Sequence, residues 1–187
     1  LLSRLAQRVR ELDPDVITGW NVADFDFGVL ARRAEALGVR FDLGRAPGPV
    51  RILGSNNPRQ ATQVILPGRL VLDGLALVRG AFMKFESYSL EHVSREVLGD
   101  GKLFTGRDRG REIQRTFRED RRKFVDYNLK DARLVSEILE RLDLVELAVA
   151  RSRLTGLPPD RVSASIAAFD LLYLTELGRR GIVAPSV

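Results

Sequence analysis

Apolar residues follow helical and strand-like spacings through the first part of the chain. They recur every three or four positions over residues 1–12, which predicts an amphipathic helix that an Asp-Pro pair ends. The β-branched run 15–18 predicts a buried strand, residues 19–24 a turn, and residues 29–37 a second helix. A strand, a turn and a helix in this order are typical of an α/β domain.

The middle of the chain predicts further strands and helices. Two β-rich runs, 50–53 and 62–66, flank a long loop and predict a hairpin. Residues 70–73 predict another short strand, and the patterns at 75–84 and 90–98 predict two helices. Strands and helices therefore alternate through the first hundred residues.

The last third of the chain is predicted to be mainly helical. We expect a basic loop over residues 99–112 and one long helix over 116–142. Gly and Pro at 155–160 indicate a boundary or linker. Residues 163–177 predict a helix that is apolar on most of its circumference, and such a helix needs cover from several sides.

Composition narrows the class of protein. The chain has 187 residues, no cysteine and a formal net charge of +5. The lack of cysteine excludes disulfides and thiolate metal sites and fits a reducing cytoplasm. No apolar run approaches the roughly 18 residues that a membrane span needs, so no membrane is expected as a partner. Between Arg107 and Lys123, eight basic residues face four acidic ones, which indicates a solvated face or a contact with a phosphate backbone.

One stripe of the predicted long helix carries a carboxylate. At about 100° per residue, Asp131 falls on the same face as four residues that suit a core. A carboxylate on an apolar face is costly unless it is paired, hydrogen-bonded or bound to a metal. Asp131 is therefore either a metal ligand or the partner of a basic residue at the rim. Tyr127 lies one turn earlier and either packs in the core or acts at whatever Asp131 binds. The stripe consists of Phe124, Tyr127, Asp131, Leu134 and Ile138.

A second candidate acid lies in the turn after the first strand, where ligand sites of α/β domains often occur. Asp24 and Asp26 could simply cap the helix that follows. We expect Phe25 and Phe27 to pack, which would hold Asp26 between apolar groups and make it the better candidate for an inward acid. Divalent cations such as Mg²⁺ prefer oxygen ligands, but two aspartates a hundred residues apart cannot easily complete a two-metal site.

Several segments resemble motifs of family B DNA polymerases. Residues 13–26, with an aromatic-Asn pair and Phe-Asp, closely resemble the second exonuclease motif, and residues 127–131, Tyr-Asn-Leu-Lys-Asp, resemble the third. Residues 68–73 and 87–102 resemble the connecting elements of the family, and residues 155–185 the start of the polymerase palm. The ordered set covers nearly the whole chain and is most similar to bacterial members of the family.

The resemblance implies the fold and the reaction. It implies a ribonuclease H-like 3′–5′ exonuclease fold, an α/β fold with a mixed sheet, over residues 1–150, and a linker and helix over 151–187. The parent protein would be a DNA polymerase of the bacterial cytoplasm that also hydrolyses the 3′-terminal nucleotide of DNA. Its partners would be single-stranded 3′ ends, primer-template DNA and the remainder of the polymerase chain.

The resemblance also assigns roles to residues. Asp26 and Asp131 would be ligands of Mg²⁺ or Mn²⁺, and Tyr127 would help to position the attacking water. Asn21 and Phe25 would lie near the 3′-terminal nucleotide. His92, the single histidine, is interpreted as surface or core and not as catalytic.

The first exonuclease motif of the family, Asp-x-Glu, occurs nowhere in the chain. We expect it before Leu1 and the polymerase motifs beyond Val187, so that the chain is a fragment. Such a fragment would bind Mg²⁺ poorly, show no nuclease activity and self-associate through its truncated surfaces. The alternative is a catalytically silent module that binds or organises DNA with the same fold. A nucleotide-binding protein is disfavoured, because no glycine-rich phosphate loop is present.

Overall fold

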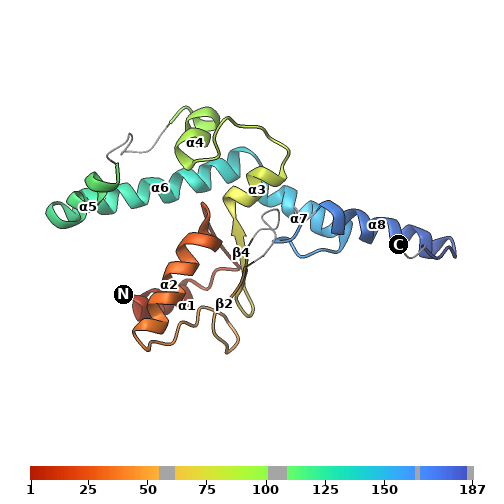
Figure 1. Ribbon diagram of the computed structural model, residues 1–187, viewed down its shortest axis with the longest axis horizontal. Coiled ribbons are helices and arrows are strands. Elements are labelled where there is room, and N and C mark those ends of the chain that lie inside the picture. The colour runs from red at the N-terminus through yellow and green to blue at the C-terminus, as the bar shows by residue number, and fades with distance from the viewer. Residues whose placement is uncertain (55–61, 101–108, 163–164, 185–187) are drawn as a thin grey trace. The chain divides into compact units, whose positions relative to one another are not determined.

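The structure is a computed structural model, and it describes four stretches of the 187-residue chain (Figure 1). Two of the residues that carry the family resemblance, Lys102 and Pro185, fall outside the described residues, as does the loop predicted between the hairpin strands. In the part of the chain that is described, no helix is long and apolar enough to cross a membrane. The described stretches are residues 1–54, 62–100, 109–162 and 165–184.

The chain divides into two compact units. The first combines Leu1–Phe82 with Val145–Val187, and the second is Met83–Leu144. This division does not test the predicted boundary at residue 150, which stays a prediction.

The first unit is built around a parallel pair of strands. β1 (Val16–Gly19) pairs with β4 (Leu70–Asp73) in a register that sets Gly19 opposite Asp73. A second pair, β2 and β3, is the predicted hairpin and is antiparallel. The other elements of this part are α1 (Leu2–Leu12), the π-helical turn η1 (Val22–Phe27), α2 (Gly28–Ala36), β2 (Arg51–Leu53), β3 (Gln63–Ile65) and α3 (Gly74–Gly80).

One apolar cluster holds these elements together. Ala6 of α1, Phe27 at the end of η1, Ala34 of α2 and Val71 of β4 all belong to it and are almost fully buried. Full burial of a side chain such as Phe or Val stabilises a fold by about 1.5–3 kcal/mol. The cluster therefore fixes η1 and α2 against the strand pair.

Ion pairs hold the end of α1. Asp13 ends the helix, as the sequence predicts, and takes the left-handed conformation. Its Oδ1 lies 2.8 Å from Nε of Arg45 and 2.8 Å from Nη1 of Arg69. The guanidinium of Arg45, followed by that of Arg69, holds the pKa of the Asp13 carboxyl below its ordinary value. Arg69 is buried and also donates to the carbonyl oxygen of Leu43 at 2.9 Å. These ion pairs and this hydrogen bond thereby join α1, the loop before β2 and the start of β4.

The prediction that β1 is a buried strand is wrong. Val16 is 39% exposed, Thr18 is exposed and Ile17 is half-buried. The reason lies in the pairing, because among the described residues β1 hydrogen-bonds to a single neighbouring strand, β4. A strand at the edge of a sheet leaves part of its side chains and backbone in solvent.

The described residues of the second unit form three helices. α4 (Leu90–Leu98) has the predicted bounds, and Gly99 follows it with a positive φ of 71°. α4 packs against α6 (Arg121–Arg141), as does α5 (Arg109–Glu119). The predicted stripe of α6 is confirmed: Leu134, Ile138 and Tyr127 are almost completely buried, and Phe124 and Asp131 are half-buried.

Two predictions in this unit are wrong. Residues 109–112 are helical and not part of a loop, and the helix predicted over 116–142 is divided at Asp120. Asp120 leaves the helical conformation, with φ −140° and ψ 83°, and its carboxylate accepts a hydrogen bond from the amide of Lys123 at 3.0 Å. An aspartate at this position caps the second helix, which is why the chain divides there.

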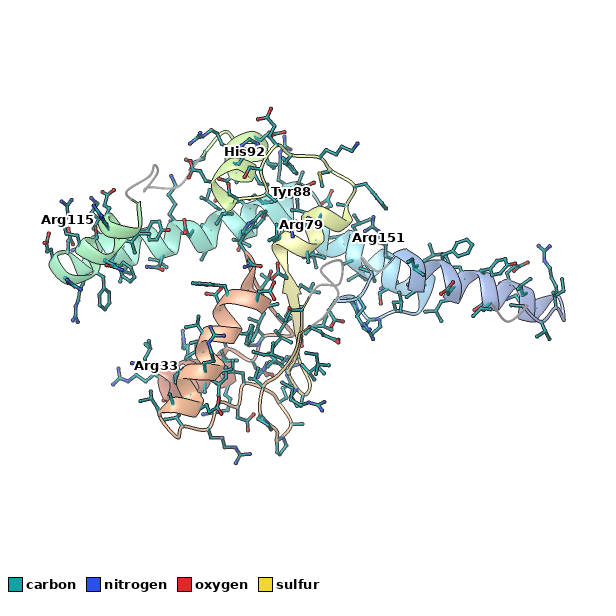
Figure 2. The ribbon with its side chains drawn as sticks, viewed as in Figure 1. Arg33, Arg79, Tyr88, His92, Arg115 and Arg151 are labelled. Atoms are coloured by element: carbon teal, nitrogen blue, oxygen red, sulfur yellow. The ribbon has the colours of Figure 1, made fainter. Side chains whose placement is uncertain are left out.

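Two helices complete the first unit. α7 (Leu144–Thr155) ends at the predicted break, where Gly156 has φ 75°. Arg151 of α7, labelled in Figure 2, donates to the carbonyl oxygen of Gly80 at 2.7 Å. α8 (Ser165–Arg179) confirms the predicted apolar helix. Its apolar side chains are not covered by the other described residues, and Ile166, for example, is 78% exposed.

The apolar stripe of α6 is expected to carry the stability of the second unit. Ile138 is fully buried, so Ile138→Ala should lower the free energy of unfolding by about 2–5 kcal/mol. Leu129 on the same helix is 50% exposed, and Leu129→Ala should cost less than about 1 kcal/mol. Urea denaturation of both variants measures the difference, and equal losses would show that the stripe is not the core of the unit.

Candidate functional site

The turn that carries Asp26 is set by close contacts between β1 and η1. Gly19 ends β1 so near to Val22 that a Cβ at this glycine would lie 2.9 Å from the Val22 Cβ. Asn21 takes the left-handed conformation with φ 58°, and the chain then enters the π-helical turn η1. Single-turn π-helices are rare and occur frequently at functional sites. The predicted turn is therefore confined to residues 20–21.

The side chains of η1 differ from the expectation. Phe27 is buried, but Phe25 is 65% exposed, so the prediction that both phenylalanines pack is wrong for Phe25. Successive residues of a helical turn point in different directions, and the core lies on one side only. Asp26 is exposed and does not point into the core. Although the residue is exposed, neighbouring protein atoms partly desolvate its carboxyl group, and this desolvation and, to a lesser degree, the negative charge of Asp73 raise the pKa of the Asp26 carboxyl.

Asp73 is a central residue of the turn that the sequence analysis did not identify. Its Oδ2 accepts a hydrogen bond from the amide of Ala23 in η1 at 3.1 Å. Its Oδ1 accepts from the amides of Leu75 at 3.0 Å and Ala76 at 3.2 Å, which caps α3. An aspartate between a strand and a helix was a visible capping signal in the sequence. The tie to η1 was not visible, because it joins residues 50 positions apart.

Tyr127 and Asp131 lie together on α6. Tyr127 is 6% exposed, Asp131 is half-buried, and the Oδ1 atom of Asp131 is shielded from solvent. Both residues have polar, ring or electrostatic contacts within the chain. The two alternatives from the sequence, in which Asp131 is a metal ligand or the partner of a basic residue, therefore both stay open. Their spacing of one helical turn brings the phenol and the carboxylate to the same face, as predicted.

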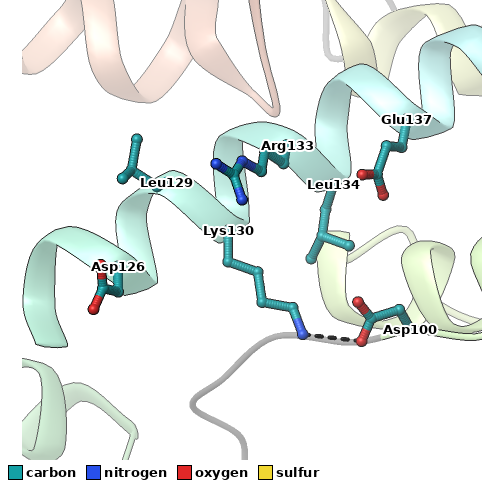
Figure 3. A pocket seen from close by; sticks show the side chains of 7 residues that line it. All are labelled: Asp100, Asp126, Leu129, Lys130, Arg133, Leu134 and Glu137. Carbon is teal, nitrogen blue, oxygen red and sulfur yellow. Dashed lines mark hydrogen bonds and ion pairs between the residues drawn. The ribbon is translucent and has the colours of Figure 1, made fainter.

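A polar cavity of about 420 Å³ lies on another side of α6 (Figure 3). Lys130 forms an ion pair with Asp100 there, with 2.9 Å between Nζ and Oδ1. The charges of the lining have both signs, and neither Tyr127 nor Asp131 belongs to it. The cavity therefore adjoins the stripe at Leu134 but does not include the predicted site residues. It is lined by Asp100, Asp126, Leu129, Lys130, Arg133, Leu134 and Glu137.

The predicted site residues fall into the two units. Asn21, Phe25 and Asp26 belong to the first unit, and Tyr127 and Asp131 to the second. Each unit brings its own residues together, and the meeting of the two sets stays a prediction. Among the described residues, no group of three or more His, Cys, Asp or Glu side chains could hold a metal ion. The carboxylates have the right chemistry for Mg²⁺ but do not form a complete ligand set.

Comparison with known proteins decides the family. Residues 1–93 match the family model for DNA polymerase family B, exonuclease domain. The whole chain is 40% identical to DNA polymerase II of Escherichia coli, of which it covers 24%. The chain belongs to the family B DNA polymerases. Another relative is the DNA polymerase delta catalytic subunit of Oryza sativa, which is 35% identical over 96% of this chain and 17% of the relative.

A solved family B polymerase confirms the predicted exonuclease fold. The family B DNA polymerase from the hyperthermophilic archaeon Pyrobaculum calidifontis matches all of this chain with a TM-score of 0.82 and 25% sequence identity. The chain covers 24% of that structure, so it spans about a quarter of the length of that polymerase and of Escherichia coli DNA polymerase II. The match to the exonuclease family covers η1 and both strands of the parallel pair.

Asp73 is expected to hold η1 in place in this family B domain. Asp73→Ala removes the cap of α3 and the acceptor for the Ala23 amide, so it should lower the free energy of unfolding by about 1–3 kcal/mol. Hydrogen exchange at the Ala23 amide should become faster. Asp24→Ala is the matched control, because Asp24 is exposed and should change stability by less than about 0.5 kcal/mol. Equal stability and unchanged exchange in the two variants would contradict this role.

Proposed function

We propose that the chain is part of the 3′–5′ proofreading exonuclease of a DNA polymerase and contributes to hydrolysis of the 3′-terminal nucleotide of DNA. The observation that carries this proposal is the half-buried Asp131, the single acid in the apolar stripe of α6, with Tyr127 one turn before it. The match of residues 1–93 to the exonuclease family also supports this proposal, and it covers the half of the chain that does not contain Tyr127 and Asp131.

Each residue of the site has a role that suits its surroundings. Asp26 and Asp131 would each give carboxylate oxygens to Mg²⁺ or Mn²⁺, which would activate water and stabilise charge on the leaving oxygen. The phenol of Tyr127 would orient the attacking water beside Asp131. Phe25 presents an exposed ring that could stack on the terminal base, and Asn21 lies at the start of the same turn.

Further carboxylates are needed to complete this site. The 187 residues contain no Asp-x-Glu, and two aspartates are too few ligands for two divalent cations. The chain alone is therefore expected to bind Mg²⁺ weakly and to leave DNA uncut, and the remainder of a polymerase chain would supply the missing acids. Primer-template DNA would be the substrate, and a bacterial cytoplasm the place of action.

Self-association is a further expectation. The exposed edge of β1 and the uncovered apolar residues of α8 are surfaces that a second copy could cover.

A chimera tests the nuclease role. The chain would replace the corresponding segment of Escherichia coli DNA polymerase II, to which it is 40% identical, and the chimera would be assayed for release of nucleotides from the 3′ end of single-stranded DNA. The unmodified polymerase is the positive control. We expect the chimera to digest DNA and the Asp26→Ala and Asp131→Ala versions to lose at least about a hundredfold in rate, because each removes a ligand.

Control variants separate chemistry from folding. Glu137→Ala changes another acid of α6 outside the predicted site and should leave the rate within about twofold. Tyr127→Phe keeps the buried ring and should lower the rate without unfolding α6. A chimera that digests DNA equally well with and without Asp131 would refute the assignment. A well-folded chimera without activity would instead favour the catalytically silent module.

A further inference from the structure

α5 presents a row of arginines on the side opposite its buried face. At about 100° per residue, Arg111, Arg115 and Arg118 fall within an arc of about 60°. All three are exposed, and Figure 2 shows Arg115 projecting from α5. Thr116 is 4% exposed and Ile113 is half-buried on the other side of the helix, which packs against α6. The packing of α5 therefore leaves the arginine row free to meet another molecule.

The positive charge of this row is little compensated. Arg115 lies 3.8 Å from Glu119, but both side chains are about two-thirds exposed, and such surface pairs contribute little. The other acid of α5, Glu112, lies on its flank and faces Lys123 of α6 at 4.0 Å. A row of exposed guanidinium groups with few acids is suited to phosphates.

α5 also carries an exposed aromatic ring, Phe117, about 100° around the helix from Arg118 and directed toward the first turn of α6. Phe117 is 52% exposed, and its ring meets that of Phe124 edge to face with 5.2 Å between centroids. The guanidinium of Arg121 lies 5.9 Å from the centre of the Phe117 ring. Proteins that hold single strands combine a basic surface along the backbone with aromatic rings on which bases stack, and arginines add cation–π contacts. A duplex keeps its bases stacked inside and would gain nothing from Phe117.

We propose that α5 and the first turn of α6 form a contact surface for single-stranded DNA. The arginine row holds phosphates, and Phe117 with Arg121 receives a base. This inference rests on the proposed function, since the bound strand is the one whose 3′ end is digested. The surface acts by binding alone, and its residues are different from Asp26, Tyr127 and Asp131.

Binding of a labelled single-stranded oligothymidine, measured by fluorescence anisotropy in EDTA, tests this surface. The test variant carries Arg111→Gln, Arg115→Gln and Arg118→Gln, since glutamine keeps the helix propensity. The control carries Arg4→Gln, Arg8→Gln and Arg33→Gln, three exposed arginines of α1 and α2, and makes the same change in charge. Figure 2 labels Arg33 of this control set.

The two variants should differ in affinity and in salt dependence. The test variant should bind at least about tenfold more weakly, and its plot of log K against log salt should flatten by about 2, because each lost phosphate contact to a single strand removes about 0.7. The control should keep the affinity within about twofold. If both variants lose the same affinity, or if the slope of the test variant is unchanged, the proposal is overturned.

Phe117→Leu tests the preference for a single strand. Leucine keeps an apolar contact with Phe124 but has no ring face, so binding of the single strand should weaken about fivefold. Binding of a duplex of the same length should not change. An unchanged affinity for the single strand, or an equal loss for the duplex, would overturn the assignment, provided that circular dichroism shows the helices intact.

This assay is independent of the chemistry. Binding in EDTA requires no hydrolysis, so an inactive chimera would refute the proposed nuclease and leave the DNA-binding surface standing. If the binding assay overturns the surface while the chimera digests DNA, the DNA-binding surface is refuted and the proposed nuclease stands.

Discussion

The parallel pairing of β1 with β4 is the constraint on which the first half of the proposed site depends. Its register places Asp73 opposite Gly19, at the point where the chain leaves the strand and enters η1. The Asp73 carboxylate can then accept hydrogen bonds from η1 on one side and from the start of α3 on the other. Phe27 anchors the far end of η1 in the core. Asp26 is thereby displayed at a defined place on the surface of a rigid turn.

The second half of the proposed site depends on the apolar stripe of α6. α6 buries one stripe, and the spacing of that stripe places Tyr127 and Asp131 on its inner face near the middle of the helix. The same unit carries α5, whose exposed Phe117 contacts the first turn of α6 and whose arginine row lies on the side away from α6. One helical unit thus combines a candidate acid with a surface suited to a single strand, while the other unit carries η1.

Helical periodicity made the most dependable predictions. The bounds of α4 and the stripe of α6 follow from apolar spacing and a terminal glycine, because these depend on neighbours three or four residues apart. The exposure of β1 does not follow from its apolar run, because it depends on how many strands pair with it. The break at Asp120 was missed because a capping aspartate inside an apolar pattern resembles an exposed helical residue. The role of Asp73 needed the tertiary contact with Ala23. The helical stripe and the turn after the first strand had already made Asp26, Tyr127 and Asp131 candidates, and the motif resemblance assigned their roles.

The central claim is that Asp26 and Asp131 act at one site, and paramagnetic broadening by Mn²⁺ tests it most directly. Mn²⁺ would be titrated at substoichiometric amounts into the ¹⁵N-labelled protein while the amide signals of η1 and α6 are followed. A shared site predicts that the signals around Asp26 and around Asp131 broaden together, and that Asp131→Asn weakens the broadening at both. Broadening of one set alone, or of both sets with independent responses to Asp131→Asn, would contradict the account.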